Sequence, residues 1–440
     1  MFNAAIIGIS GFGAVHYNDF LREHAAGRIH IVGATVINQE EEAQKCAFLR
    51  SIGCRLFTDY REMLRELSGK IDICFIPTGI ALHAPMTIDA LESGANVYVE
   101  KPIAATLQEV DRMREAERRT GKFIAVGYQS MYQPETRRIK EMLLAGRIGK
   151  ITTLKSYSLW PRDSVYYHRN NWAGKLRNGS AWVLDSPFTN AVAHYLNLLS
   201  FYAGNSFEGI GEIESVQAGL FRANPVETND TAWIRGVMRG GAQLLFYSTH
   251  CSDVNEGPIS EIQGELGSIT YASEKVEIQY KNGEREEFPM TPGDKMRANI
   301  YTQLIQRLQD PAAFICTAEI AAGHTRICNA VFDSVGNPEK PVPGGLHRRR
   351  DDRRNDRLRC VCARDSGNRR CDPRRLPGEP SPRYPGFSVG GQRRTLRHGG
   401  VPRLLRRRVV SGEKGFFSGN HLIFRPITLF LRRGLPIQRG

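Results

Sequence analysis

Short apolar runs alternate with longer amphipathic segments from the start of the chain to about residue 127. A near-continuous apolar run predicts a buried parallel strand, and an apolar stripe of helical period predicts a helix. Strands are therefore expected at residues 4–7, 29–36, 72–76, 97–99 and 123–127, and helices at 14–21, 61–67, 86–93 and 107–120. This alternation is typical of an α/β unit with a doubly wound parallel sheet of the Rossmann type.

The pattern changes after residue 127. A helix is expected at 134–145, and strands, most of them with period-two alternation, at 151–160, 215–221, 231–238, 242–250, 268–272 and 275–280. Helices are expected again at 299–308 and 317–333. These elements predict a C-terminal α+β domain with a large, open, mostly antiparallel sheet. We therefore divide the chain into residues 1–126, 127–342 and 343–440.

A glycine-rich turn joins the first strand to the first helix, and it contains Gly8, Ser10, Gly11, Phe12 and Gly13. In a G-x-G-x-x-G turn the outer glycines allow a tight bend and a close helix–strand contact, while backbone N–H groups bind a pyrophosphate. Here a serine occupies the middle glycine position, where its hydroxyl can still donate to phosphate. The turn predicts a dinucleotide-binding site.

The end of the second strand carries the residue that reads the adenosine ribose of a dinucleotide. That position is Asn38, followed by three glutamates at 40–42. An aspartate would favour NAD and an arginine would favour NADP. The glutamates should repel a 2′-phosphate, so the sequence favours NAD slightly over NADP, although the three acids also fit a solvated helix start.

The strand at 97–99 ends in Glu100, Lys101 and Pro102. Proline cannot donate to a strand ladder, so the strand is expected to stop there. Open α/β sheets bind ligands at the carboxyl ends of their strands. We therefore expect Lys101 to face a bound nicotinamide and the alcohol or ketone that reacts with it; the competing interpretation is a solvated lysine after a strand.

Together these features resemble the glucose–fructose oxidoreductase / inositol dehydrogenase / rhizopine-catabolism (Gfo/Idh/MocA) family. The resemblance rests on the glycine turn, the loop from Pro77 and Thr78 to His83, the Glu100–Pro102 strand end, and segments 127–129 and 145–150. It covers most of residues 4–340. It implies an NAD(P)-dependent dehydrogenase or reductase of sugars and cyclitols, and a sheet domain that commonly forms a dimer face.

The resemblance also assigns residues. The family's lysine falls on Lys101 and its loop histidine on His83. The other residues that it implies at the cofactor are Pro77, Thr78, Glu100 and Gln129.

In the family an aspartate and, four residues later, a histidine share one helix face near the lysine. Counted forward from the preceding glycine turn, the family's aspartate position is Asp185. Counted four residues back from His194, the same position is Asn190. About five residues are therefore inserted in this chain relative to the family pattern. His194 has a suitable ordinary pKa to take the hydroxyl proton, and Lys101 would bind the substrate oxygen. The catalytic candidates are Lys101, His194, Asp185 and Asn190, with the choice between the last two left open.

An aromatic and polar loop precedes this segment. Aromatic rings stack on sugars, and arginine hydrogen-bonds hydroxyl groups. The substrate-binding candidates are Tyr166, Tyr167, Arg169 and Trp172, alongside Lys101 and His194. A partly ordered interface loop is the alternative interpretation.

The formal net charge is +14, which alone would suggest a nucleic-acid binder. Residues 347–440, however, hold roughly two dozen arginines, one lysine and about seven acids, a net charge of about +18, which leaves about −4 for the body. No nucleic acid is therefore expected to bind the body. The tail itself allows three interpretations: a basic arm that binds RNA or DNA, a metal site at Cys360, Cys362 and Cys371 with non-standard spacing, and an out-of-frame translation, which we favour.

The remaining cysteines are scattered, which fits reduced thiols, and no apolar run reaches the ~20 residues that a membrane helix needs. The first strand follows Met1 almost directly, so no signal peptide is expected.

We expect a cytoplasmic, homo-oligomeric (dimeric or tetrameric) NAD(P)-dependent oxidoreductase with no metal, acting on a sugar or cyclitol. The alternative is a sugar-sensing protein that binds the dinucleotide without turnover. Nucleic-acid binding through the tail would show a steep salt dependence and vanish on truncation near Pro343.

Overall fold

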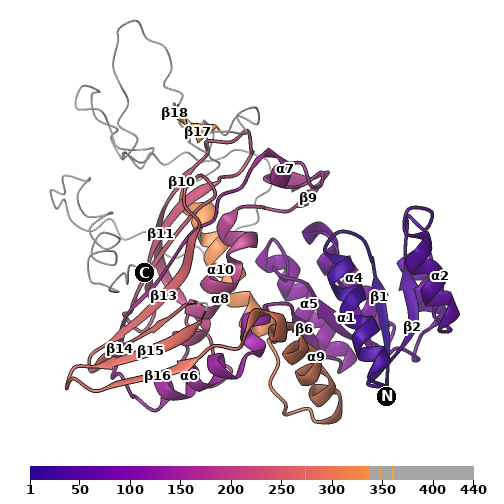
Figure 1. Ribbon diagram of the computed structural model, residues 1–440, viewed down its shortest axis with the longest axis horizontal. Helices are drawn as coiled ribbons and strands as arrows, with labels where there is room; N and C mark the ends of the chain where they lie inside the picture. Colours follow the sequence, from indigo (N-terminus) through magenta and orange to yellow (C-terminus); the bar gives the residue numbers. More distant parts are fainter. Residues whose placement is uncertain (273, 336–345, 348–358, 361–440) are drawn as a thin grey trace, which may run out of the picture.

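The computed structural model describes residues 1–272, 274–335, 346–347 and 359–360. It contains a parallel six-stranded sheet followed by a mixed, mostly antiparallel eight-stranded sheet (Figure 1). The predicted fold class is confirmed. The boundary at residues 126 and 127 stays a prediction.

The first sheet is wound from strands in the order β3-β2-β1-β4-β5-β6, and every neighbouring pair is parallel. Its strands are β1 (Phe2–Ile7), β2 (Ile29–Thr35), β3 (Arg55–Phe57), β4 (Ile73–Ile76), β5 (Asn96–Val99) and β6 (Ile124–Val126). The order reverses between β1 and β4. A crevice for a ligand forms at such a reversal, outside the carboxyl ends of the strands.

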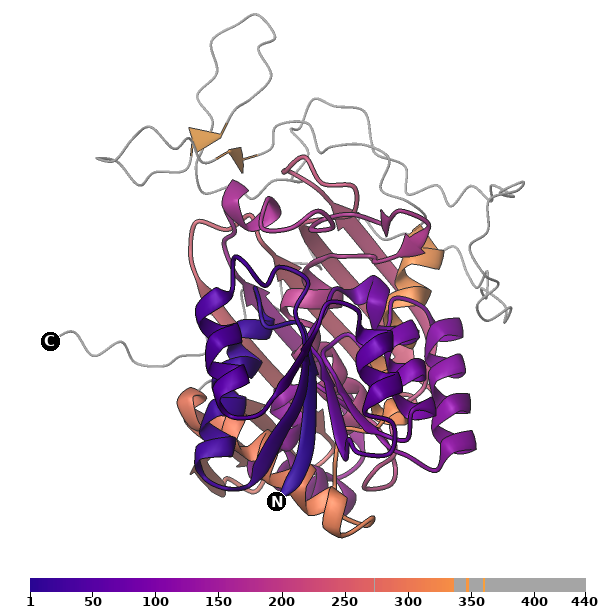
Figure 2. The ribbon, with the colours of Figure 1, turned by 90° about the vertical axis from the view of Figure 1, so that its right-hand side faces the viewer.

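Helices cover both sides of this sheet (Figure 2). They are α1 (Gly13–Ala25), α2 (Ala43–Ser51), α3 (Tyr60–Glu66), α4 (Ile80–Glu92) and α5 (Leu107–Thr120). The start of α5 follows from its sequence: Thr106 and Glu109 form the expected reciprocal capping box.

Helix α4 corrects one expectation. It begins at Ile80 rather than at residue 86, so His83 lies on a helix and not in a loop, and Pro85 lies inside the helix. A proline there removes one backbone hydrogen bond. Ile80 is buried in a small apolar cluster with Val183 and Leu184 of the second unit, and this packing offsets the loss.

The second sheet has the order β10-β11-β12-β7-β13-β14-β15-β16, and only the β12–β7 pair is parallel. Its strands are β7 (Ile151–Leu159), β10 (Ile213–Phe221), β11 (Thr231–Met238), β12 (Gln243–Thr249), β13 (Glu256–Gly264), β14 (Gly267–Tyr271), β15 (Lys275–Tyr280) and β16 (Arg285–Pro289). Strands β3 and β13 were not expected from the sequence.

The helical segments of the second unit are η1 (Gln129–Tyr132), α6 (Pro134–Leu144), α7 (Ser164–Tyr167), η2 (Pro187–Ala191), α8 (Ala193–Tyr202), α9 (Gly293–Gln309) and α10 (Ala318–Val335). Helix α9 begins six residues earlier than residue 299, where it was expected. Two short ladders pair β8 (Arg177–Asn178) with β9 (Ala181–Trp182), and β17 (Leu346–His347) with β18 (Arg359–Cys360).

Helices α8 and α10 lie between the large sheet and the Rossmann unit (Figure 1). Helix α10 contacts β10 and α8 on one side and α5 and β6 on the other. A bridge between Ala125 and Thr317 extends the parallel sheet toward this helix. The two units therefore share one continuous apolar core, which fixes their relative position.

Within the described ranges, six cysteines are free, no cluster of metal-ligating side chains occurs, and no helix combines the length and hydropathy needed to cross a bilayer. Most of the tail from residue 348 lies outside the described residues. So do Cys362 and Cys371, and with them the predictions for a metal site, a basic arm or a shifted reading frame.

Candidate active site

The glycine turn has the geometry that a pyrophosphate site requires. Gly8 and Gly11 have positive φ angles of 95° and 55°. A Cβ on Gly13 would lie 2.5 Å from the Gly8 carbonyl oxygen, so only glycine lets α1 approach β1 this closely. The backbone N–H groups of Gly11 and Phe12 donate to no acceptor in the described part of the chain. These residues fit a bound dinucleotide.

The end of β2 is hydrogen-bonded to this turn. The Ser10 hydroxyl donates to Asn38 Oδ1 at 3.2 Å, and Asn38 Nδ2 donates to Glu41 Oε2 at 2.9 Å. A hydrogen bond from Lys45 is the main cause that lowers the pKa of Glu42, which keeps that carboxylate ionised near Asn38. The Glu41 carboxylate and the ion pair of Glu42 with Lys45 therefore lie at the position where the adenosine ribose is expected.

Pro77 and Thr78, at the end of β4, lie beside the glycine turn: a Cβ on Gly13 would be 3.6 Å from Pro77, and one on Gly8 would be 4.0 Å from Thr78. His83 is buried behind them. Its Nε2 faces the Thr78 carbonyl at 3.1 Å and its Nδ1 faces the Pro102 carbonyl at 2.8 Å. Burial lowers the pKa of His83, and a neutral imidazole donates from one nitrogen only, so His83 hydrogen-bonds one of these two carbonyls and lies against the other. Neither nitrogen is free for a ligand.

Glu100 is buried behind Lys101 rather than in the crevice. Its Oε1 lies 2.8 Å from His16 Nε2, and its Oε2 accepts from the Lys101 backbone N–H at 3.2 Å. Burial opposes ionisation, but the hydrogen bond and charge of His16, with the charges of Lys101 and Arg297, bring the pKa of Glu100 to about 2. The carboxylate anchors the strand end that presents Lys101.

The ammonium group of Lys101 points to Asn190. Nζ donates to Asn190 Oδ1 at 2.7 Å and to the Asn190 carbonyl at 2.8 Å. Burial lowers the pKa of Lys101, partly offset by the negative charges of Glu100 and Asp185. Lys101 thus joins the Rossmann unit to the segment that carries the second unit's polar groups.

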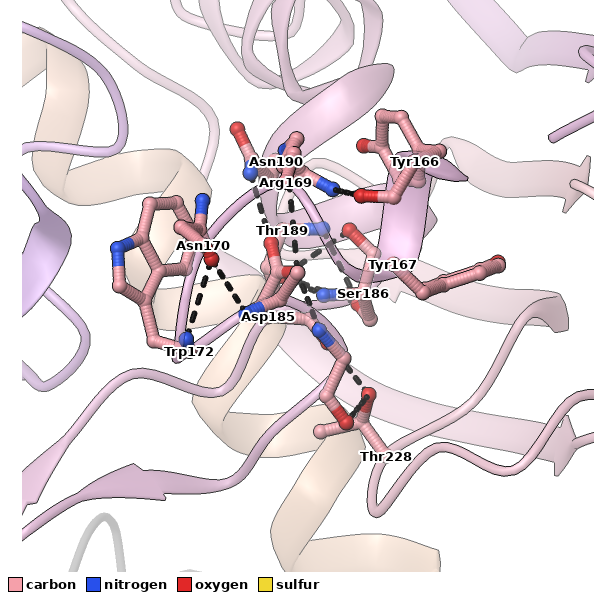
Figure 3. Close-up of polar contacts among 12 residues, drawn as sticks. Tyr166, Tyr167, Arg169, Asn170, Trp172, Asp185, Ser186, Thr189, Asn190 and Thr228 are labelled. Carbon is pink, nitrogen blue, oxygen red and sulfur yellow. Dashed lines mark hydrogen bonds and ion pairs between the residues drawn. The ribbon is translucent and has the colours of Figure 1, made fainter. Parts of the chain in front are cut away.

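Asp185 lies on the other side of Asn190 (Figure 3). Its Oδ1 accepts from Asn190 Nδ2 at 2.7 Å, its Oδ2 accepts from the Gly174 N–H at 2.7 Å, and Arg169 Nη2 lies 3.8 Å away. Burial raises the pKa of Asp185 despite these contacts. The two residues between which the sequence could not choose are therefore both present, in the series Lys101–Asn190–Asp185.

The inserted residues explain this arrangement. Pro187–Ala191 form one wide π-type turn, closed by the Val192 N–H on the Pro187 carbonyl at 2.9 Å, and α8 begins only at Ala193. Ser186 and Thr189 cap the turn reciprocally. The turn folds back, which brings Asn190 onto Asp185.

His194 is in the first turn of α8, beside these groups. Its Nδ1 is buried and has no hydrogen-bond partner among the described residues. Burial, helped by the positive charge of Lys101, lowers the pKa of His194 to about 3. The imidazole is therefore neutral at physiological pH and a weaker base than an exposed histidine.

A second buried histidine supports this region from behind. His324 Nε2 donates to the Phe188 carbonyl at 2.9 Å, which leaves Nδ1 to accept from the Tyr128 hydroxyl at 2.8 Å. The Tyr128 ring in turn packs edge-on against His194, with centroids 5.7 Å apart. His324 thus holds both the turn that carries Asn190 and the ring that packs on His194.

The predicted aromatic loop covers the site. Arg169 lies over the Tyr166 ring at 3.7 Å, and the Tyr167 hydroxyl lies 3.1 Å from His250 Nδ1. Trp172 reaches the Rossmann unit, where a Cβ on Gly79 would meet its Nε1 at 3.0 Å.

Gln129 is the first residue of η1, after β6, and its backbone carbonyl accepts from Gln133 Nε2 at 2.8 Å.

Sequence reasoning missed His16, Tyr128, Thr228, Arg297 and His324. His324 contacts residues more than a hundred positions away, and Thr228 binds the Asp185 carbonyl from the loop before β11 (Figure 3). His16 lies on the apolar face of α1, where a histidine reads as a core residue. No local pattern could have found these contacts.

Comparison with known proteins agrees with this geometry. Residues 2–128 match a family model described as an oxidoreductase family with an NAD-binding Rossmann fold, and residues 136–270 match the GFO/IDH/MocA C-terminal domain. A solved structure of the WlbA dehydrogenase from Bordetella pertussis, in complex with NADH and UDP-GlcNAcA, has the same fold. Its TM-score is 0.60 at 22% identity, over 76% of this chain and 96% of that chain.

Two curated relatives are also similar. An inositol 2-dehydrogenase from Azotobacter vinelandii is 27% identical over 197 residues, 44% of this chain and 53% of that protein. A dTDP-3,4-didehydro-2,6-dideoxy-alpha-D-glucose 3-reductase from Streptomyces violaceoruber is 28% identical over 173 residues, 39% of this chain and 49% of that protein. The chain spans about half the length of these relatives. Its two matched domains, the glycine turn and the lysine at the end of β5 show that the chain belongs to the Gfo/Idh/MocA oxidoreductase family.

Proposed function

We propose that this protein is a dehydrogenase or reductase that interconverts a hydroxyl and a carbonyl group on a sugar or cyclitol, with NAD(H) as redox partner. The observation that supports it most is the placement of the Lys101 ammonium beside Asn190, Asp185 and His194 at the mouth of the Rossmann crevice. The named relatives act on an inositol and on a nucleotide-linked sugar, which agrees with this substrate class.

Gly8, Gly11, Phe12 and Gly13 would hold the pyrophosphate of the dinucleotide, whose nicotinamide, when bound, exchanges a hydride with the substrate carbon. Lys101 donates to the reacting oxygen. When substrate binds, the Lys101 ammonium gives up one hydrogen bond to Asn190 and donates to the substrate oxygen instead. Its positive charge stabilises the negative charge that develops on this oxygen. Asn190 and Asp185 keep the ammonium oriented throughout.

His194 moves the proton in this proposal. Its lowered pKa makes the free imidazole a weak base, so His194 accepts the hydroxyl proton during oxidation only as the hydride leaves and the hydroxyl becomes more acidic, and it returns the proton during reduction. Its Nδ1 has no partner in the described part of the protein, so nothing competes for that nitrogen. Tyr128 and His324 hold the ring and the adjoining turn.

NAD rather than NADP is the proposed cofactor. Asn38 offers hydrogen bonds to ribose hydroxyls, and Glu41 and Glu42 lie where a 2′-phosphate would bring two more negative charges. With a good substrate, kcat/KM should be at least about tenfold higher with NAD than with NADP, which corresponds to about 1.4 kcal/mol.

A sensor that binds dinucleotide and sugar without turnover is the second candidate. The neutral Asn190 directly against Lys101, with the carboxylate one residue further away, favours it. The two candidates differ in a single property, namely whether bound nicotinamide is reduced.

We also propose a homo-oligomer that assembles through the large sheet. On the face opposite α8, Trp233, Tyr247, Tyr157 and Ile259 pair directly across β11, β12, β7 and β13. Such a row of aromatic and apolar side chains fits the interface of an obligate dimer.

A panel of polyols and sugars tests the function, with both NAD and NADP, read by the absorbance of the reduced nicotinamide. We expect turnover with at least one compound and a strong preference for NAD. Tight binding of dinucleotide and sugar with no reduction under any condition would instead support the sensor.

A further inference from the structure

The loop over the candidate site is basic within a body of net negative charge. Between Trp160 and Asn178 lie Arg162, Arg169, Lys175 and Arg177, against the single acid Asp163. The body before the tail carries about −4 in total. This stretch therefore carries a local excess of positive charge beside the candidate site.

Arg169 is held rigidly but is incompletely paired. Its guanidinium lies 3.7 Å from the Tyr166 ring centroid and 5.6 Å from that of Trp172, and Nη1 donates to the Tyr166 carbonyl at 2.6 Å. Nη2 is 3.8 Å from Asp185 Oδ2, beyond hydrogen-bonding distance. The side chain is still 29% exposed. A guanidinium group held in this way is oriented to bind a planar anion such as a carboxylate through two N–H groups.

Two more positive or donor groups surround the same ring. The Arg162 guanidinium lies 5.0 Å from the Tyr166 centroid, forms no ion pair within the described ranges, and has a buried Nε without a partner. His250 packs edge-on against Tyr166 at 5.4 Å and is only 3% exposed. With the Tyr167 hydroxyl donating to its Nδ1, the proton lies on Nε2, which also lacks a partner.

The basic groups at this site outnumber the carboxylates of the described residues that reach them. Asp185 is the one carboxylate that reaches the centre of this group among the described residues, and both of its oxygens already accept hydrogen bonds from Gly174 and Asn190. Lys101 feels the negative charges of both Glu100 and Asp185, whereas Arg169 reaches Asp185 alone and Arg162 forms no ion pair within the described ranges. Arginine pairs most strongly with carboxylates and phosphates, which it can bind through two parallel N–H groups.

We propose that the substrate carries an anionic group, a carboxylate or a phosphate, and that Arg169, assisted by Arg162, binds this group while Lys101 binds the reacting oxygen. The proposal rests on the dehydrogenase function above and narrows its substrate class to acidic sugars or cyclitols. The rival explanation is that Arg169 has only a structural role, as a partner of Asp185.

The test compares matched pairs of compounds: glucuronate with glucose, galacturonate with galactose, and glucose 6-phosphate with glucose. Each is assayed with NAD on the full chain, for the wild type, Arg169→Gln, Arg169→Lys and Arg177→Gln. Arg177 is the matched control, because it belongs to the same basic loop but stacks on Trp182 and donates to the Ser180 carbonyl.

We expect one acidic compound to exceed its neutral partner in kcat/KM, and Arg169→Gln to reduce that preference by about 30- to 100-fold, the usual range for a charge-assisted pair. Arg169→Lys should retain part of the preference, and Arg177→Gln should leave it unchanged. The carboxylate and phosphate arms identify which anion the site takes. Equal activity on both members of every pair, or equal losses on both in Arg169→Gln, would overturn the proposal.

A binding measurement separates this inference from the proposed function. Each compound is titrated against the NAD complex, with tryptophan fluorescence as the signal, since Trp172 lies against Arg169. Binding of an acidic compound that depends on Arg169, without turnover, would support the anion site while the dehydrogenase fails; no binding of any acidic compound would overturn the site. If Arg169→Gln does not fold, judged by its melting curve, Arg162→Gln gives the same comparison.

Discussion

Asn190 connects two groups of opposite charge without carrying a charge of its own. Its amide oxygen accepts from Lys101 and its amide nitrogen donates to Asp185. A carboxylate in this position would stabilise the ammonium form of Lys101 more strongly than a polarised amide does. The buried Lys101 therefore keeps a lowered pKa, and its proton is more available to a substrate oxygen.

Substitutions in this series should affect the rate more than substrate affinity. Asn190→Ala removes both contacts and should lower kcat about 10- to 100-fold, while Asp185→Asn should lower it about tenfold, since each loses a charge-assisted contact of roughly 1.5–3 kcal/mol at most. Steady-state kinetics measure both. Asp163→Asn, an exposed cap of α7, is the control. If neither substitution changes kcat, the assignment of this series to catalysis is wrong.

Buried histidines should make the fold sensitive to acid. Burial lowers the pKa of His194 and His250 to about 3 and that of His324 to about 4. In the unfolded chain these side chains bind protons near pH 6.5, so the free energy of unfolding should fall as the pH drops from about 6.5 to about 4, by roughly 1.4 kcal/mol per pH unit for each histidine. Urea unfolding at several pH values measures the slope.

The substitution His324→Gln provides the matched comparison. It removes one of four buried histidines with a lowered pKa, since burial lowers the pKa of His83 as well, so its slope between about pH 6 and pH 5 should be about one quarter shallower than that of the wild type. An unchanged slope would show that His324 is not buried in neutral form.

At the scale of elements, the strands and helices that follow local patterns were predictable, and those that depend on distant packing were not. The capping box of Thr106 and Glu109 marks α5 in the sequence alone. By contrast, β13 contains Pro258, which argues against a strand; the structure tolerates it because the pairing with β7 shifts register between Glu256 and Ile259, where no ladder hydrogen bond is needed. The site shows the same division: Lys101 follows from its strand end, whereas the back-folded turn at Pro187–Ala191 does not.

The glycine turn offers a test at this scale. Gly13→Ala places a Cβ 2.5 Å from the Gly8 carbonyl oxygen and must separate α1 from β1, whereas Gly11→Ala meets no atom within 4 Å and strains only a positive φ. We expect Gly13→Ala to weaken NADH binding at least about tenfold, and Gly11→Ala to cost only about 1 kcal/mol of stability. Fluorescence titration and thermal unfolding measure the two effects. Equal affinities in the two variants would mean that the close helix–strand contact does not shape the site.

At the scale of the whole molecule, the central helices α8 and α10 fix the Rossmann unit against the large sheet, so the candidate site is assembled from both halves. Lys101 comes from one half and Asn190, Asp185 and His194 from the other. The charge distribution is a property of this scale too, since the net charge of +14 hides a body that is mildly acidic. Composition showed this asymmetry, but the position of the basic loop beside the candidate site became visible only in three dimensions.

The proposed dimer belongs to the same scale. Trp233→Arg places a charge in the row of paired side chains on the large sheet, and it should shift the protein toward monomer in light scattering at micromolar concentration, because an unpaired buried charge is costly. Gln279→Arg, at an exposed position of β15, is the control and should leave the mass unchanged. A wild type that is already monomeric would contradict assembly through this face.

The central claim is that the Lys101 ammonium acts on the reacting carbonyl or hydroxyl group. The most direct measurement is hydride transfer by Lys101→Met in a single turnover, together with the dissociation constant for NADH. The account predicts that the dissociation constant changes by less than about threefold while the transfer rate falls at least about a thousandfold, a loss of roughly 4 kcal/mol in transition-state stabilisation. A variant that transfers hydride at the wild-type rate, or one that loses NADH binding instead, would contradict it.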